Sequence, residues 1–200
     1  MDSPVANIAS IERALASVGE VAKSSDPNAI QASPKIVLPG VGTFPAAMAW
    51  LRETGVADAL RNAVAGGASL LGICVGHQLL FEDSDEMGLT AGLGLCRGKV
   101  RRFDNSLVAV PQIGWNRVSV IENVLFEGIP DGTPFYFVNS YRAVDVDEKD
   151  TLATASYGEP FVAAVGSGSV CGVQFHPEKS SDAGLRVLRN FVTATDGSTP

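Results

Sequence analysis

A cysteine between two glycines lies where a buried strand is expected to meet a helix, and this junction constrains the fold more than any other part of the chain. The apolar run at residues 68–73 predicts a strand. Its end overlaps the sequence Gly72-Ile73-Cys74-Val75-Gly76, after which the residues have a helical pattern. Glycines allow the backbone to turn sharply and to approach a neighbouring chain closely. The thiol would therefore stand at the carboxyl end of a strand, as in a nucleophile elbow.

Two interpretations of Cys74 follow from this segment alone. Free cysteine is among the most buried residue types, so Cys74 could be an ordinary core residue at a tight turn. Alternatively it is a nucleophile, because the partial positive charge at a helix start stabilises a thiolate.

A second motif, His176-Pro177-Glu178, favours the nucleophile. Residues 170–175 predict a buried strand, and Pro177 forces the chain to leave the sheet. A histidine and a carboxylate two residues apart can serve as a general base and its orienting group, although His176 could also be a core histidine and Glu178 a solvated acid. The chain has only two histidines, and the other follows the elbow. A Cys74, His176 and Glu178 triad is the economical assignment.

The order of the predicted elements indicates an α/β fold with an open, mostly parallel central sheet flanked by helices and a β-rich C-terminal half. We expect one domain over residues 1–200 with a disordered tail at 196–200. A hairpin turn is predicted at 166–168, and Asp182 is expected to cap the last helix. Helices are predicted near 8–18, 43–52, 57–65 and after 182, and strands at 36–38, 68–73, 95–103, 117–121, 135–139, 152–156, 161–165 and 170–175.

Composition excludes some classes of function. The net charge of −7 argues against nucleic acid as the main partner, because phosphate neutralisation needs clustered basic residues. Three cysteines without close spacing indicate reduced thiols rather than disulfides or a metal site. We find no signal peptide and no apolar stretch long enough for a membrane span, and so expect a cytoplasmic protein without membrane contact, metal or cofactor.

Together, the segments 72–78 and 175–178 resemble the class I (triad) glutamine amidotransferases, and the resemblance implies a flavodoxin-like α/β fold. Four further stretches resemble the glutaminase subunits of imidazole glycerol phosphate synthases, which act in histidine biosynthesis. The resemblance runs from about residue 7 to 191. These stretches are Pro39-Gly40-Val41-Gly42-Thr43-Phe44, Gly114-Trp115-Asn116, Tyr136-Phe137-Val138-Asn139-Ser140-Tyr141-Arg142 and Lys179-Ser180-Ser181.

The resemblance implies hydrolysis of L-glutamine to glutamate and ammonia through a thioester on Cys74. A backbone N–H from Val41 or Gly42, paired with that of Val75, would form the oxyanion hole. The substrate would be held by Gln78, Asn139, Ser140 and Tyr141.

The resemblance also implies a partner. That partner is a (β/α)8-barrel cyclase, which uses the ammonia to form imidazole glycerol phosphate and an aminoimidazole carboxamide ribotide. Trp115, Asn116 and Lys179 are the candidate interface residues, since an aromatic and polar pair is typical of interface anchors, although tryptophan is as often a core residue.

Two departures from the family leave the function and the start of the chain open. His77 stands where this subfamily usually has methionine and resembles the carbamoyl phosphate and anthranilate branches, so a different acceptor of ammonia is possible. The segment 1–7 supplies no first strand, from which we expect either that the native chain starts upstream of Met1 or that another segment fills the place. The sequence is also compatible with a stand-alone γ-glutamyl cysteine hydrolase and with a non-catalytic binding subunit.

Overall fold

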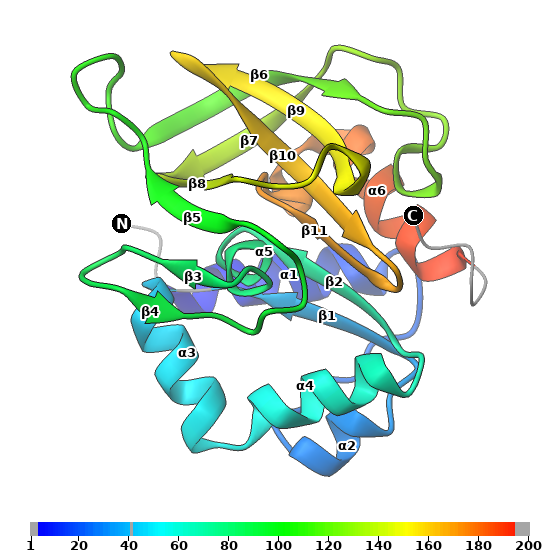
Figure 1. The fold of residues 1–200 in the computed structure, drawn as a ribbon. Coiled ribbons are helices and arrows are strands. Elements are labelled where there is room, and N and C mark those ends of the chain that lie inside the picture. The colour runs from blue at the N-terminus through cyan, green and yellow to red at the C-terminus, as the bar shows by residue number, and fades with distance from the viewer. Residues whose placement is uncertain (1–3, 41, 195–200) are drawn as a thin grey trace.

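The fold is a single twisted sheet with helices packed on its parallel end (Figure 1). The structure, a computed structural model, describes residues 4–40 and 42–194, so the predicted tail at 196–200 and Val41 lie outside the described residues. Within these residues the sheet has eleven strands, and its main path runs β1-β2-β11-β10-β8-β5-β3-β4.

The parallel end consists of three strands, β1 (Lys35–Pro39), β2 (Ser69–Ile73) and β11 (Val170–Val173). All five residues of β2 are buried, as its continuous apolar run predicts for a central parallel strand. The residues of β1 are only half-buried, and no strand of the described residues pairs with its outer edge. The carboxyl ends of all three strands lie at the same margin of the sheet.

The C-terminal half continues the same sheet with antiparallel strands. A hairpin joins β10 (Glu159–Ser167) to β11, as predicted from the glycine-rich turn. The α/β fold is confirmed; the sheet is mixed, with parallel pairing concentrated at the helix-flanked end, because hairpin connections between successive strands impose antiparallel pairing. The other strands are β3 (Asp83–Ser84), β4 (Thr90–Ala91), β5 (Lys99–Arg102), β6 (Gln112–Val120), β7 (Thr133–Asn139), β8 (Tyr141–Val144) and β9 (Thr151–Tyr157).

Helices cover both faces of the parallel strands. Alternate residues of β2 belong to different hydrophobic clusters: Leu71 and Ile73 pack with α1 (Pro4–Ala16) and α6 (Ser181–Thr193), whereas Leu70 packs with the helices of the other face. This is the period of two expected for a strand between two layers. The helices of the second face are α3 (Phe44–Glu53), α4 (Val56–Ala65) and α5 (Val75–Leu79), and α2 (Pro27–Gln31) packs on α4.

Several predicted boundaries need correction. The residue that precedes α6 is Ser180, so Asp182 is not the cap but lies in the first turn. The strand expected at 95–103 shortens to β5, and the one expected at 117–121 lengthens to β6. The helix α2 and the short strands β3, β4 and β8 were not predicted, because their segments are too short for a clear hydrophobic period.

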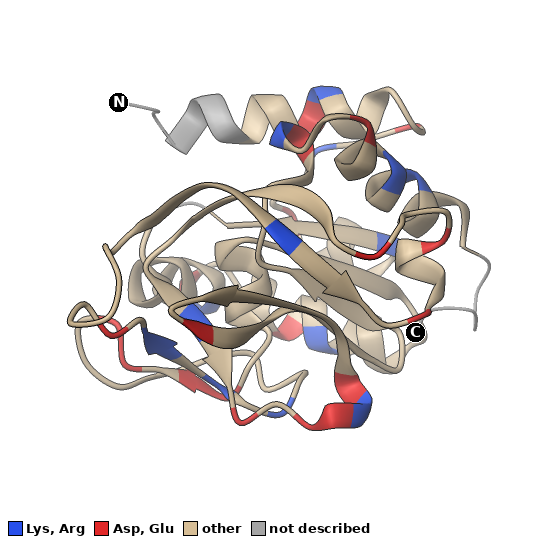
Figure 2. Cartoon of the chain, turned by 90° about the horizontal axis from the view of Figure 1, so that it is seen from above, with Lys and Arg blue, Asp and Glu red and all other residues tan. Residues whose placement is uncertain are grey.

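Acidic and basic residues are distributed over many helices, strands and loops of the chain (Figure 2). Three of the four basic residues at 97–102 are paired with acids: Arg97 lies 3.5 Å from Asp147, Lys99 lies 3.8 Å from Asp145, and Arg101 lies 2.7 Å from Asp83. These ion pairs reduce the positive charge that the segment 97–102 presents. No helix among the described residues has the length and apolar character that a membrane crossing requires.

Candidate active site

Cys74 sits in a strained turn between β2 and α5. Its backbone has φ 55° and ψ −109°, a left-handed φ that is uncommon for a residue with a side chain. Its N–H donates to the Val173 carbonyl at 2.9 Å, which ties the turn to β11. Strain of this kind persists only where the surroundings hold it, and it is concentrated at functional sites. The geometry is that of the expected elbow.

Two glycines allow the elbow to pack against the loop after β1. A side chain on Gly76 would overlap the Leu38 carbonyl, and one on Gly40 would overlap the backbone N–H of Gly76. This contact places Gly40 beside Val75, whose N–H is the first of α5 and has no acceptor within that helix. Gly42 adopts φ 82°, while Val41 is outside the described residues.

His176 and Glu178 lie together just beyond β11. The two side chains are almost completely buried, and His176 Nδ1 is 2.9 Å from Glu178 Oε1. The His176 N–H donates to the Tyr136 carbonyl at 2.9 Å. The hydroxyl of Ser180 donates to the His176 carbonyl at 2.7 Å and accepts from the Tyr136 N–H at 3.0 Å. These hydrogen bonds hold the loop at residues 176–180, called the histidine loop below, against β7.

The electrostatics of His176 couple it to Cys74. Burial by itself would lower the pKa of His176, but the charge of Cys74 and the hydrogen bonds of Cys74 and Glu178 outweigh burial and raise that pKa to about 10. At neutral pH the imidazole therefore carries a proton and faces the sulfur. An imidazolium stabilises a thiolate, which is the nucleophilic form of cysteine. The three residues of the predicted triad are thus brought together.

Two of the side chains expected to bind substrate, those of Gln78 and Asn139, meet at one backbone carbonyl. Gln78 Nε2 donates to the Tyr141 carbonyl at 3.2 Å, and Asn139 Nδ2 donates to the same oxygen at 3.0 Å. Asn139 Oδ1 is buried and has no hydrogen-bond partner among the described residues. Ser140 lies between β7 and β8, and its carbonyl accepts from the Phe103 N–H. Gln78, Asn139 and the backbone of Tyr141 therefore form one cluster. The side chain of Ser140 forms no hydrogen bond with these groups.

Two residues of this region were not predicted from the sequence. Gln174 is fully buried, and its Nε2 is 3.9 Å from Cys74 Sγ. Glu86 Oε2 accepts from the Phe44 N–H at 2.7 Å and so holds the start of α3, directly after the 40–42 loop. A polar residue at the end of a buried apolar strand is unusual, and this signal could have singled out Gln174. The sequence around Glu86 carries no such signal.

The candidate interface residues separate into two groups. Trp115 is 54% exposed and packs edge-on against Tyr136, and Lys179 Nζ lies 5.9 Å from the centre of the same ring. Asn116, the next residue of β6, instead donates to the Ser156 carbonyl of β9. Neighbouring strand residues point to opposite faces, so the structure does not bring Asn116 together with Trp115 and Lys179.

His77 belongs to the core rather than to the site. It is fully buried, its ring packs edge-on against Phe81 at 5.1 Å, and neither ring nitrogen has a hydrogen-bond partner in the described part of the chain. Burial lowers its pKa to about 3. A neutral, enclosed imidazole presents no surface to a partner, so His77 does not select an acceptor by contact.

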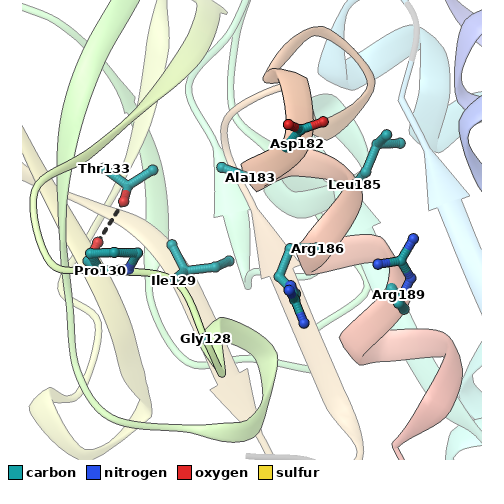
Figure 3. A pocket seen from close by; sticks show the side chains of 9 residues that line it. All are labelled: Gly128, Ile129, Pro130, Thr133, Asp182, Ala183, Leu185, Arg186 and Arg189. Atoms are coloured by element: carbon teal, nitrogen blue, oxygen red, sulfur yellow. Dashed lines mark hydrogen bonds between the residues drawn. The ribbon is translucent and has the colours of Figure 1, made fainter.

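A surface cavity lies apart from these groups. Its volume is about 450 Å³, and it opens between α6 and the loop at residues 128–133 (Figure 3). Asp182 and Arg186 line it, but no member of the triad does. The reactive site is therefore located by the chemistry of its side chains and not by this cavity.

Residues 2–195 match the family model described as glutamine amidotransferase class-I. The chain belongs to this family. A class I amidotransferase is the expectation that the segments around Cys74 and His176 raised, and it is confirmed.

The curated relatives narrow the branch of the family. The chain is 44% identical over 196 residues to imidazole glycerol phosphate synthase subunit HisH of Sulfurimonas denitrificans, which covers 96% of this chain and 95% of the relative. It is 46% identical over 193 residues to subunit HisH of Moorella thermoacetica, covering 96% and 91%. The predicted resemblance to the glutaminase subunits of these synthases is thereby confirmed.

Solved structures agree on the fold. One described as a glutamine amidotransferase superposes with a TM-score of 0.72 at 23% identity, covering 92% of this chain and 94% of the other. The structure of PurLQS from Thermotoga maritima gives a TM-score of 0.64 at 20% identity, covering 92% and 91%. At these identities the likeness concerns the fold alone.

The contact at Gly76 predicts a large effect of one methyl group. Gly76→Ala should lower the free energy of unfolding by at least about 2 kcal/mol, because its side chain would overlap the Leu38 carbonyl. Gly66→Ala is the control, since Gly66 has φ −81° and its nearest neighbours are 3.3 Å away. Urea unfolding of both variants measures the difference, and equal stabilities would contradict the tight contact.

The burial of His77 predicts acid sensitivity. The unfolded chain protonates this residue below pH 6.5 but the folded chain only near pH 3, so stability is complete above 6.5 and falls as the pH drops. Between pH 6.5 and 5.0 the wild type should lose about 2 kcal/mol more than His77→Met. His176, with its raised pKa, contributes the same amount to the wild type and the variant at each pH, so it does not change their difference.

Urea unfolding at several pH values measures the two slopes. Phe81→Leu, which changes the same part of the core without removing an ionisable group, should keep the wild-type slope. Identical slopes for the wild type and His77→Met would show that the imidazole is not held neutral by the fold.

Proposed function

We propose that this chain hydrolyses the side-chain amide of L-glutamine and delivers the ammonia to a cyclase partner, as the glutaminase subunit of an imidazole glycerol phosphate synthase. The observation that carries the proposal is the contact of Cys74 with His176, which in turn is bonded to Glu178. Family membership and the HisH relatives support the substrate and the pathway. The same proposal includes a cytoplasmic location, which the sequence analysis predicted.

The first half of the reaction forms a thioester. The Cys74 thiolate attacks the amide carbon of glutamine, and the negative charge moves to the amide oxygen. The Val75 N–H and a second backbone N–H from the loop at Val41 and Gly42 receive that oxyanion. His176 then donates its proton to the amide nitrogen as the C–N bond breaks, and ammonia leaves. Glu178 holds the imidazole in the orientation that this transfer needs.

The second half hydrolyses the thioester. His176, now neutral, takes a proton from water, and the resulting hydroxide attacks the thioester carbon. The C–S bond breaks, glutamate leaves, and the thiolate and imidazolium are restored. Gln78, Asn139, Ser140 and Tyr141 are proposed to hold the amino-acid end of the substrate. The unpartnered Asn139 Oδ1 is an acceptor suited to its ammonium group.

The partner is proposed to dock on the surface around Trp115. The exposed indole, the Tyr136 ring and Lys179 form one cluster, and Tyr136 is bonded through its backbone to His176 and Ser180. Exposed tryptophan and tyrosine are frequent anchors of interfaces. A (β/α)8-barrel cyclase seated here would cover the active-site margin, so that ammonia could pass without reaching solvent. Asn116 is an interface residue only if the partner also reaches the edge near β9.

Removal of triad side chains tests the chemistry. Cys74→Ala should lower kcat for glutamate release by at least about 1,000-fold, and Glu178→Gln by at least about 100-fold, because the first loses the nucleophile and the second the orientation of His176. Glu127→Gln changes an exposed acid outside the site and should stay within about twofold of wild type.

Glutamate release is measured with and without the cyclase. Stimulation of the wild type by the cyclase supports the synthase subunit, whereas equal turnover without it would indicate a stand-alone hydrolase. Turnover by Cys74→Ala near the wild-type rate would rule out the thioester route.

Docking at Trp115 predicts a local hot spot. Trp115→Ala should weaken binding of the cyclase by about 30-fold or more, the effect expected for removal of a buried aromatic anchor. Trp50→Ala is the matched control, since Trp50 is 48% exposed but lies on α3. Isothermal titration with the cyclase measures both affinities, and a larger loss with Trp50→Ala would move the interface elsewhere.

A further inference from the structure

A buried glutamine contacts the reactive sulfur. Gln174 follows β11 directly and is fully buried, two residues before His176. Its backbone is fixed, because its N–H donates to the Ala163 carbonyl at 2.8 Å. Its side chain reaches Cys74, with Nε2 at 3.9 Å from Sγ. The mechanism above assigns no role to this amide.

The orientation of the Gln174 amide is set by Gln78. Gln78 Nε2 can only donate, and it lies 3.0 Å from Gln174 Oε1 and 3.2 Å from the Tyr141 carbonyl. The atom of Gln174 that faces Gln78 must therefore be its oxygen. It follows that the Gln174 NH2 group faces the sulfur. A chain of hydrogen bonds thus runs from the Tyr141 carbonyl through two amides to Cys74.

The sulfur has a competing neighbour on another side. Cys74 Sγ lies 3.8 Å from the Val138 carbonyl oxygen, which can only accept a hydrogen bond and so favours the protonated thiol. The Gln174 N–H is a donor and favours the thiolate, because hydrogen bonds to the charged form stabilise it. The balance between these two contacts decides which form the sulfur takes and where it points.

We propose that Gln174, oriented by Gln78, is a positioning residue that holds the Cys74 sulfur as a thiolate in line with His176. The proposal rests on the glutaminase function and deepens it, because it concerns the resting state of the same nucleophile. Without this donor the thiol turns its proton to the Val138 carbonyl. The role of Gln78 is then to fix the amide rather than to meet the substrate alone.

The test is the pH profile of alkylation of Cys74 by iodoacetamide, read by mass spectrometry of the Cys74 peptide. The other two thiols are poor competitors, since burial raises the pKa of Cys96 to about 12 and raises that of Cys171 further. Gln174→Met keeps a similar volume but removes the donor. In Gln174→Met the pH profile of Cys74 alkylation should shift by about one pH unit to higher pH, so that the alkylation rate at pH 7 falls about 10-fold.

Two further variants separate positioning from folding. Gln174→Glu keeps the shape but turns a carboxylate oxygen toward the sulfur, and should move the profile at least as far in the same direction. Gln112→Met removes a buried glutamine that makes no hydrogen bond to Cys74, and it should leave the pH profile of Cys74 alkylation unchanged. With the cyclase present, Gln174→Met should lower kcat for glutamine more than it raises KM.

The outcomes are distinct. If Gln174→Met or Gln174→Glu is folded by circular dichroism and keeps the wild-type profile, Gln174 is a core residue only and the proposal is wrong. Should Gln174→Met unfold, the result for Gln174→Glu decides alone, and unfolding of both likewise overturns the positioning role in favour of a structural one. A wild type that alkylates normally but never hydrolyses glutamine would contradict the glutaminase function and not this inference.

Discussion

The close packing of the elbow against two neighbouring strand ends is the constraint on which the site depends. Cys74 is bonded through its N–H to β11, and Gly76 rests on the Leu38 carbonyl at the end of β1. Parallel strands bring their carboxyl ends to one margin, where ligand sites of open α/β sheets gather. Cys74, His176 and the loop after β1, which we propose as nucleophile, base and oxyanion loop, therefore come from three distant segments of the chain.

The two histidines show how partners, rather than burial, decide the state of an ionisable group. Both are buried, yet the pKa of His77 falls to about 3 and that of His176 rises to about 10. His77 packs against Phe81, and its ring nitrogens have no hydrogen-bond partner among the described residues, so desolvation alone lowers its pKa. His176 faces Cys74 and Glu178, whose negative charges favour the imidazolium. His77 is thus a neutral residue of the core, whereas His176 is suited to proton transfer.

The sequence predicted those features that local chemistry determines. The strand before Cys74, the turn at Gly72 to Gly76 and the pairing of His176 with Glu178 follow from residues close together in the chain. Features set by distant contacts were missed. Asp182 was expected to cap α6, but Ser180 precedes the helix, and its hydroxyl makes the hydrogen bonds that hold the histidine loop against β7. The contact of Gln174 with Cys74 depends on sheet register, which no short motif encodes.

The central claim, that glutamine reacts at the sulfur of Cys74, is tested most directly by covalent labelling. A glutamine analogue with an electrophile at the amide carbon is incubated with the protein and the proposed cyclase partner, and the labelled peptide is identified by mass spectrometry. The account predicts one label, on Cys74, and protection by excess glutamine. A label on Cys96 or Cys171, or labelling that glutamine does not reduce, would contradict it.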